Sequence, residues 1–158
     1  MDAIILIGIQ GSGKTTFYQQ RYLETHVRIS LDLLRTRNRE QVLLDTCLRI
    51  GQPFVIDNTN VTVAERARYI APARAARVRV LGYFFEPDPK AAYARNVQRP
   101  ERGRIPAAGV FGTLKRLERP ALAEGFDELY RVWVSESGEF RVENWQDSNH
   151  PSIERASW

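Results

Sequence analysis

Short apolar runs alternate with segments of helical periodicity along this chain. The runs at residues 3–7 and 54–57 are continuous and rich in β-branched side chains, which is typical of parallel strands buried on both faces. The pattern predicts strands at residues 3–7, 27–30, 54–57, 78–85 and 129–134, and helices at residues 14–24, 32–50, 62–76, 88–97 and 109–118. Because strands and helices alternate, we predict an α/β fold with a parallel sheet of about five strands and helices on both faces.

The end of the chain departs from this alternation. Residues 1–136 are predicted to form one domain, and residues 137–158 a C-terminal extension of the same domain. Within the extension Phe140, Val142 and Trp145 are spaced as in a further short strand. Residues 147–158 carry no such pattern, so we expect them to fray.

Arginine dominates the positive charge. The chain has 23 basic and 19 acidic residues, a net charge of +4, and only Lys14, Lys90 and Lys115 are lysine. Arginine binds phosphate through two parallel hydrogen bonds, which favours phosphate-bearing partners, although a GC-rich genome explains an arginine excess equally well. The single cysteine, Cys47, cannot form an intramolecular disulfide, and no apolar run approaches the roughly 18 residues of a membrane span. We therefore expect a cytoplasmic protein without membrane contact.

Residues 8–15, Gly-Ile-Gln-Gly-Ser-Gly-Lys-Thr, match the phosphate-loop pattern G-x-x-x-x-G-K-[ST] between a predicted strand and a predicted helix. The glycines let backbone N–H groups converge on phosphate oxygens, and the helix N-terminus favours negative charge. Lys14 is expected to act on the outer phosphates of ATP, and the Thr15 hydroxyl to ligate Mg²⁺. We therefore predict a P-loop NTPase-type fold in which ATP is bound by Gly8, Gln10, Gly11, Ser12, Gly13, Lys14, Thr15 and Thr16.

Two polar groups follow predicted strands, at the sheet edge where ligands bind in parallel α/β folds. Asp32 could accept the proton of an attacking hydroxyl, and Arg35, three residues later on the predicted helix, could hold an anionic acceptor. Taken alone, this pair fits better a carboxylate at a helix N-terminus and a solvated arginine.

The second group is Asp-Asn-Thr-Asn at residues 57–60. Asp57 could organise Mg²⁺ through water, and Thr59 or Asn60 could bind an acceptor phosphate. A polar turn after a strand explains the same residues equally well.

A third group consists of Arg95, Arg99, Arg102 and Arg104. Arginines this close repel one another unless an anion gathers them. We predict that they lie on a lid that closes over the triphosphate. The alternative is a solvated basic turn or a patch that binds nucleic acid.

Taken together, these elements resemble the kinase domain of the polynucleotide 5′-hydroxyl kinase family. The resemblance extends from about residue 4 to residue 134 and includes the phosphate loop, Asp32 with Arg35, and residues 57–60. It also includes Glu-Arg-Ala-Arg-Tyr at residues 65–69, Arg95-Asn96 and Leu-Ala-Glu-Gly-Phe at residues 122–126. Residues 57–60 and 122–126 are far more particular to this family than the generic phosphate loop.

The resemblance implies roles for the acceptor side of the site. Asp32 would be the general base that activates the acceptor 5′-hydroxyl, and Arg35 would bind the acceptor's phosphate. Asp57 and Thr59 would lie beside the acceptor. Leu31 and Leu33 stand where some relatives carry a basic residue and a second aspartate, which thins the polar contacts to the acceptor.

The resemblance also implies that lid arginines contact ATP. Arg102 is favoured as the catalytic lid residue, Arg99 and Arg104 are the other candidates, and Arg95 is expected near the adenine. Relatives often carry a phosphatase domain or a ligase in addition, but the chain contains no D-x-D-x-T nucleophile motif.

Three functions are compatible with these residues. The first is ATP-dependent phosphorylation of a 5′-hydroxyl of DNA or RNA, with Asp32 as base and Lys14, Mg²⁺ and a lid arginine stabilising the transferred group. The second keeps this chemistry but uses a small-molecule hydroxyl, of a nucleoside, a sugar or another metabolite. The third is a nucleotide-binding switch that transfers nothing. These functions differ in the identity of the acceptor or in its absence, and we rank them in this order.

Zinc and thiol chemistry are not expected, because His26 and His150 are isolated and Cys47 is predicted to be a buried helix residue. Trp133, Trp145 and Trp158 are predicted as packing residues rather than base-stacking platforms.

Overall fold

The structure is a computed structural model that describes residues 1–101 and 104–146. Its strands form one sheet in the order β2-β3-β1-β4-β5-β6. Their bounds are Asp2–Ile7 (β1), Val27–Ile29 (β2), Phe54–Asp57 (β3), Arg79–Phe85 (β4), Glu128–Val134 (β5) and Phe140–Asn144 (β6). Strands β1 to β5 are parallel, and β6 pairs antiparallel with β5. The predicted parallel α/β sheet is confirmed, and the strand expected at residues 140–145 extends it to six strands.

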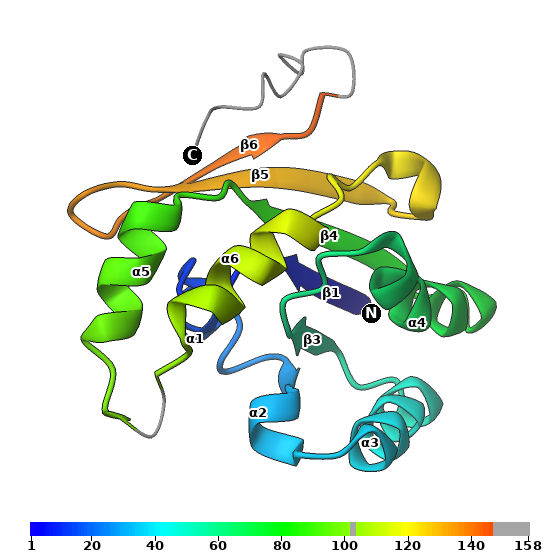
Figure 1. Cartoon of the computed structure of the whole chain (residues 1–158). Helices are drawn as coiled ribbons and strands as arrows, with labels where there is room; N and C mark the ends of the chain where they lie inside the picture. The colour runs from blue at the N-terminus through cyan, green and yellow to red at the C-terminus, as the bar shows by residue number, and fades with distance from the viewer. Residues whose placement is uncertain (102–103, 147–158) are drawn as a thin grey trace.

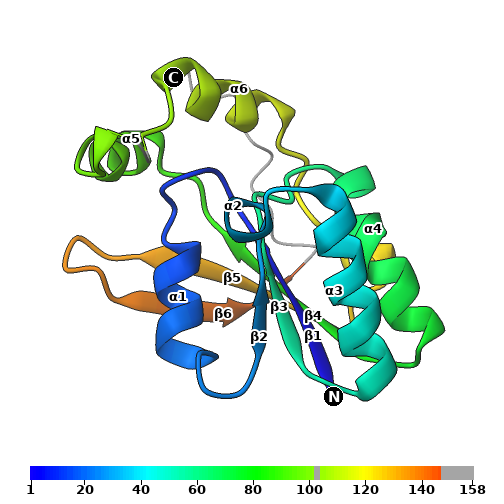
Figure 2. The ribbon, with the colours of Figure 1, turned by 90° about the horizontal axis from the view of Figure 1, so that it is seen from below.

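Helices cover both faces of this sheet (Figure 2). Helix α1 (Lys14–Arg21) lies on one face, where Phe17 packs with Ile4, Val55 and Phe85. Helices α3 (Arg37–Ile50) and α4 (Val63–Ala75) lie on the other face over a second apolar cluster. Cys47 is buried in that cluster, and Trp145 meets Phe84 edge to face at 5.5 Å, so both have the packing roles expected of them. No helix in the described part of the chain is long and apolar enough to cross a membrane.

Two further helices lie beyond the carboxyl ends of the strands (Figure 1). They are α5 (Pro89–Val97) and α6 (Ala107–Arg116), joined by the arginine-rich segment. Ala92 of α5 and Val110 of α6 pack against Ile9 of the phosphate loop in a small apolar cluster of their own. These two helices therefore rest on the phosphate loop, where we predicted a lid.

The helix predicted at residues 32–50 is wrong as a single element, because it is divided. The first part is α2 (Leu31–Leu34), which Ser30 caps and which ends at Arg35 with φ +70°. Thr36 then caps α3, since its side chain accepts a hydrogen bond from the backbone N–H of Arg39 at 3.2 Å. A threonine side chain that caps a new helix prevents the preceding helix from continuing through this point. The spacing of apolar residues does not reveal such a cap.

Candidate active site

The phosphate loop connects β1 to α1. Gly11 and Gly13 have φ values of +75° and +94°, which a side chain rarely permits. The loop is held on two sides, because the Gly8 N–H donates to the Thr59 carbonyl at 2.9 Å and a Cβ on Gly11 would come within 2.6 Å of the Ala92 carbonyl oxygen. The backbone geometry of the loop therefore requires glycine at positions 11 and 13.

Lys14 lies inside this loop. Its Nζ donates to the carbonyls of Gly8 and Ile9, each at 2.9 Å, and to the Ser12 hydroxyl at 3.3 Å. Burial lowers the Lys14 pKa to about 8, and the nearby Asp57 carboxylate opposes that shift. A phosphate group would offer this ammonium stronger acceptors than carbonyls, because hydrogen bonds between charged groups are about twice as strong as neutral ones.

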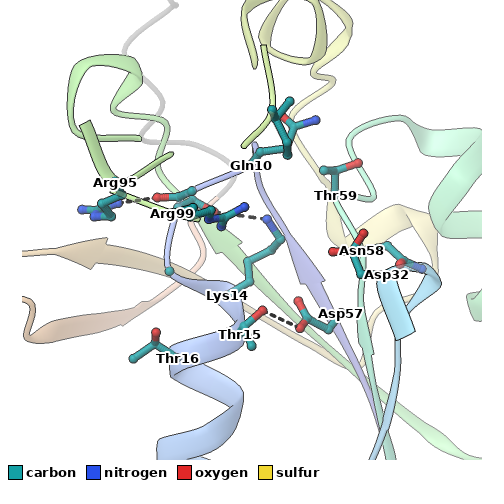
Figure 3. Close-up of a pocket in the computed structure, with 14 residues that line it drawn as sticks. Gln10, Lys14, Thr15, Thr16, Asp32, Asp57, Asn58, Thr59, Arg95 and Arg99 are labelled. Atoms are coloured by element: carbon teal, nitrogen blue, oxygen red, sulfur yellow. Dashed lines mark hydrogen bonds between the residues drawn. The ribbon is translucent and has the colours of Figure 1, made fainter. Parts of the chain in front are cut away.

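Thr15 and Asp57 form the candidate metal site. The Thr15 hydroxyl donates to Asp57 Oδ2 at 2.8 Å, and Figure 3 shows this contact beside the phosphate loop. The described residues contain no group of three or more His, Cys, Asp or Glu that could hold a metal by itself. A hydroxyl and one carboxylate nevertheless fit Mg²⁺, which usually keeps several waters and takes further oxygens from the phosphates of a nucleotide.

Arg28 of β2 is a part of this site that sequence reasoning missed. Its Nε donates to Asp57 Oδ2 at 2.8 Å, and its side chain is 25% exposed. The guanidinium also approaches the Thr15 hydroxyl, with Nη2 at 3.5 Å. Asp57 therefore has a permanent positive neighbour that is not itself among the residues that line the pocket.

Asp32 lines the same pocket as Lys14, Thr15 and Asp57, in a cavity of about 260 Å³ (Figure 3). Its carboxylate is exposed at the start of α2, and its backbone N–H donates to the Ser30 hydroxyl at 3.2 Å. An exposed carboxylate in one cavity with phosphate-binding groups is placed to meet a hydroxyl that enters from solvent.

The other residues predicted to bind the acceptor are placed differently. Thr59 lines the pocket, whereas Arg35 is exposed and outside its lining, because α2 ends there and Arg35 does not continue the helical face of Asp32. Asn60 is 2% exposed, and its Nδ2 donates to the Leu6 carbonyl at 2.8 Å. The acceptor-binding role expected of Asn60 is therefore a wrong assignment, since its amide is turned into the fold.

The turn at residues 57–60 is supported by a buried ion pair. Arg66 of α4 is fully buried, and its Nε and Nη2 donate to the two carboxylate oxygens of Glu124 at 2.7 and 3.0 Å. Its Nη1 donates to the Asn60 carbonyl at 3.0 Å. Glu124 belongs to the short 3-10 helix η2 (Leu122–Glu124). This contact gives Arg66 and Glu124, both within the segments of family resemblance, a common structural role.

Two of the arginines predicted to lie on a lid are close to the phosphate loop, one on α5 and one in the segment after it. Arg95 donates through Nη1 to the Gly11 carbonyl at 2.6 Å, and Arg99 lines the pocket (Figure 3). Ile105 also lines it, held by Asn96, whose Oδ1 accepts from the Ile105 N–H at 2.8 Å. Arg102, the favoured catalytic lid residue, lies outside the described residues.

Gln10 connects the phosphate loop to α6. Its Nε2 donates to the Thr113 hydroxyl of α6 at 2.9 Å, and the Thr113 hydroxyl donates in turn to the Gly109 carbonyl at 2.8 Å. Both α5 and α6 thus contact the phosphate loop through side chains.

A second cavity, of about 390 Å³, flanks the phosphate loop on the β5 side, lined in part by Ser12, Arg95, Arg131 and Trp133. Guanidinium carbons of Arg131 and Arg141 lie 4.5 and 4.3 Å from the centre of the Trp133 ring. Trp133 is thus a partly exposed wall of a cavity, which its prediction as a packing residue missed.

Known proteins with this architecture include nucleotide-binding proteins and kinases. Kti12 from Chaetomium thermophilum, solved in complex with ADP-AlF3, superimposes with a TM-score of 0.66 and 18% identity over 86% of this chain and 92% of that one. A gluconokinase from Sinorhizobium meliloti superimposes with a TM-score of 0.59 and 16% identity over 85% and 83% of the two chains. At these identities the likeness establishes the P-loop kinase-like fold.

A bifunctional polynucleotide phosphatase/kinase from Schizosaccharomyces pombe is 24% identical over 135 residues, which are 83% of this chain. The chain spans 33% of the length of that relative. The model of one protein family, described as an AAA domain, matches residues 4–120 and so covers the phosphate loop, Asp32, Asp57, α5 and α6. The chain belongs to this AAA domain family, as a nucleotide-binding P-loop domain of the kinase-like type.

Proposed function

We propose that this protein transfers the terminal phosphoryl group of ATP to a hydroxyl, and that the acceptor is a 5′-hydroxyl of DNA or RNA. The observation that carries the proposal is the placement of Asp32. Its carboxylate shares a cavity with Lys14 and Thr15, so a hydroxyl bound beside it would face the terminal phosphate held by the loop.

In the proposed reaction Asp32 accepts the proton of the acceptor hydroxyl as its oxygen bonds to the γ-phosphorus. The bond between that phosphorus and the bridging oxygen of ATP breaks, and ADP leaves with the bonding electrons. Lys14 and Arg99 neutralise charge on the phosphoryl oxygens. Thr15 and Asp57 would hold Mg²⁺, which supplies further charge neutralisation on the phosphates.

Remaining residues of the site would bind the two substrates. The cavity beside Ser12, Arg95 and Trp133 is placed to receive the nucleoside part of ATP, because it adjoins the phosphate loop away from Asp32. The Trp133 ring already stacks with Arg131 and Arg141, so the planar guanidinium groups of this cavity would provide the surface for the base. Thr59 lines the acceptor side, and exposed Arg35 next to α2 is available to a phosphate of a longer acceptor strand.

Two observations favour a polynucleotide acceptor. The first is the relative from Schizosaccharomyces pombe, whose name states a polynucleotide kinase activity and whose match covers 83% of this chain. The second is the exposure of Asp32, since a chain end can reach only an open acceptor side, whereas a closed pocket would admit a small molecule alone.

The test is a transfer assay with Mg²⁺ and γ-labelled ATP. The acceptors are 5′-hydroxyl DNA, 5′-hydroxyl RNA, their 5′-phosphorylated counterparts, and a panel of nucleosides and sugars. The proposal predicts label on the 5′-hydroxyl oligonucleotides alone and loss of that label in Asp32→Asn. Label found only on a small molecule would show that the acceptor is a small molecule and not a polynucleotide. ATP turnover that no acceptor stimulates would indicate a nucleotide switch.

A further inference from the structure

Helix α2, which carries Asp32, has few attachments to the rest of the fold. It is one turn long and none of its side chains is fully buried, although Leu34 packs against the apolar cluster beneath α3 and α4. Its start is held from outside the helix by the Asn58 side chain, whose Oδ1 accepts from the Leu31 N–H at 2.9 Å. The Ser30 hydroxyl supplies a local cap to Asp32. The position of the Asp32 carboxylate therefore depends in part on where the Asn58 amide is held.

Asn58 is held in turn by two buried side chains of the helices on that face of the sheet. Its Nδ2 donates to Glu40 Oε2 of α3 at 2.9 Å and to the Tyr69 hydroxyl of α4 at 3.1 Å. Because its Oδ1 accepts from a backbone N–H, the amide has one consistent orientation. Glu40 and Tyr69 are each 2% exposed.

The hydrogen bonds of Glu40 and Tyr69 are mutually consistent. The Tyr69 hydroxyl donates to Glu40 Oε1 at 3.0 Å, and Arg37 Nη1 donates to the same oxygen at 2.8 Å. Burial raises the Tyr69 pKa to about 12, so the phenol keeps its proton at neutral pH. A buried network with every member satisfied is rigid and holds one arrangement.

A purely structural link between α3 and α4 would require no contact with the turn after β3. The apolar cluster on this face already packs both helices against the sheet. The network instead ends at the backbone N–H of Leu31, adjacent to Asp32. The hydrogen-bond network therefore ends next to Asp32, the candidate general base.

We propose that Glu40 and Tyr69 are positioning residues, which act through Asn58 to fix α2 and so the place of the Asp32 carboxylate relative to the acceptor hydroxyl. This inference rests on the proposed function. A base displaced by about 1 Å can lower a rate about 100-fold without any loss of substrate binding. The network should therefore affect the transfer step and leave nucleotide affinity alone.

The test compares Glu40→Gln and Tyr69→Phe with a matched control. Glutamine keeps the shape of glutamate but turns an NH₂ group toward donors, and phenylalanine removes only the hydroxyl. The control is Tyr18→Phe, since the Tyr18 hydroxyl, also in a buried residue, donates to the His26 carbonyl at 2.9 Å and has no part in the site. We expect kcat to fall roughly 10- to 100-fold in both network variants, with ADP affinity within about twofold of wild type. Tyr18→Phe should retain the wild-type kcat.

Amide hydrogen exchange at Leu31 reports on the network without any reaction. Its protection should fall in both network variants and persist in Tyr18→Phe. Unchanged protection in both variants would overturn the inference even if the protein transfers phosphate, as would a wild-type kcat in the two variants.

A combination with Asp32→Asn separates positioning of the base from a general structural role. Once the carboxylate is absent, Glu40→Gln and Tyr69→Phe should lower the residual rate by less than about twofold. A full additive loss would mean that the network acts on the fold rather than on Asp32. If wild type shows no acceptor-dependent transfer while Leu31 behaves as expected, the proposed function fails and the network is structural.

Discussion

Replacing Arg66 with methionine should destabilise the fold far more than an ordinary arginine substitution. The Arg66 side chain is 0% exposed and donates twice to Glu124, whose side chain is 10% exposed. Methionine fills much of the volume but leaves a nearly buried carboxylate without its counter-ion. Breaking a buried pair by removal of one partner costs about 3–5 kcal/mol. For a domain of this length that corresponds to a fall in Tm of roughly 6–20 °C.

Urea denaturation followed by circular dichroism measures the change, with thermal melting as a second probe. The control is Arg116→Met, because Arg116 pairs with Glu65 at 3.3 Å with 57% of its side chain exposed. That pair should contribute below about 1 kcal/mol. The double variant Arg66→Met/Glu124→Gln should recover part of the loss, since no charge is left unpaired. An Arg66→Met protein as stable as Arg116→Met would refute the reasoning.

Three further outcomes follow from the site. Burial lowers the Lys14 pKa to about 8, and a bound phosphate favours the protonated form of Lys14. ADP binding without metal should therefore take up protons above about pH 8, and ADP affinity should fall as the pH rises further. Calorimetry in buffers of different ionisation enthalpy measures the proton uptake, and pH-independent binding would contradict this prediction. Gly11→Ala should weaken ADP binding by roughly tenfold or more, because Gly11 has φ +75° and an added Cβ would lie 2.6 Å from the Ala92 carbonyl oxygen. The control Gly112→Ala should bind ADP as wild type does, because an added Cβ there has no atom within 4 Å. Arg28→Gln removes the cation beside Asp57 and Thr15. Half-maximal binding of a fluorescent nucleotide should therefore need a lower Mg²⁺ concentration than in wild type or in Arg28→Lys. An equal or higher Mg²⁺ concentration would count against the metal site.

Sequence reasoning succeeded where the determining contacts are local or follow from strand order. The phosphate loop is recognisable because its glycines, Lys14 and Thr15 are adjacent in the chain. Asp32 and Asp57 could be placed together because parallel strands end at the same edge of the sheet. Both now line one cavity with the loop.

The residues that sequence reasoning missed have partners far away in the chain. Arg28 meets Asp57 from 29 residues away, and Asn58 meets Glu40 from 18 residues away. Neither apolar periodicity nor a turn preference carries information about such pairs. Asn60 failed for a related reason, since a polar residue after a strand can face the ligand or the fold, and its φ of +49° turns it inward.

The central claim is that the Asp32 carboxylate removes the proton from the acceptor hydroxyl. Single-turnover transfer by Asp32→Asn, with saturating ATP and a 5′-hydroxyl oligonucleotide, tests it most directly when ADP affinity is measured on the same protein. We predict a rate lowered by roughly 10²- to 10⁴-fold with ADP binding unchanged. A rate within a few-fold of wild type would contradict the account.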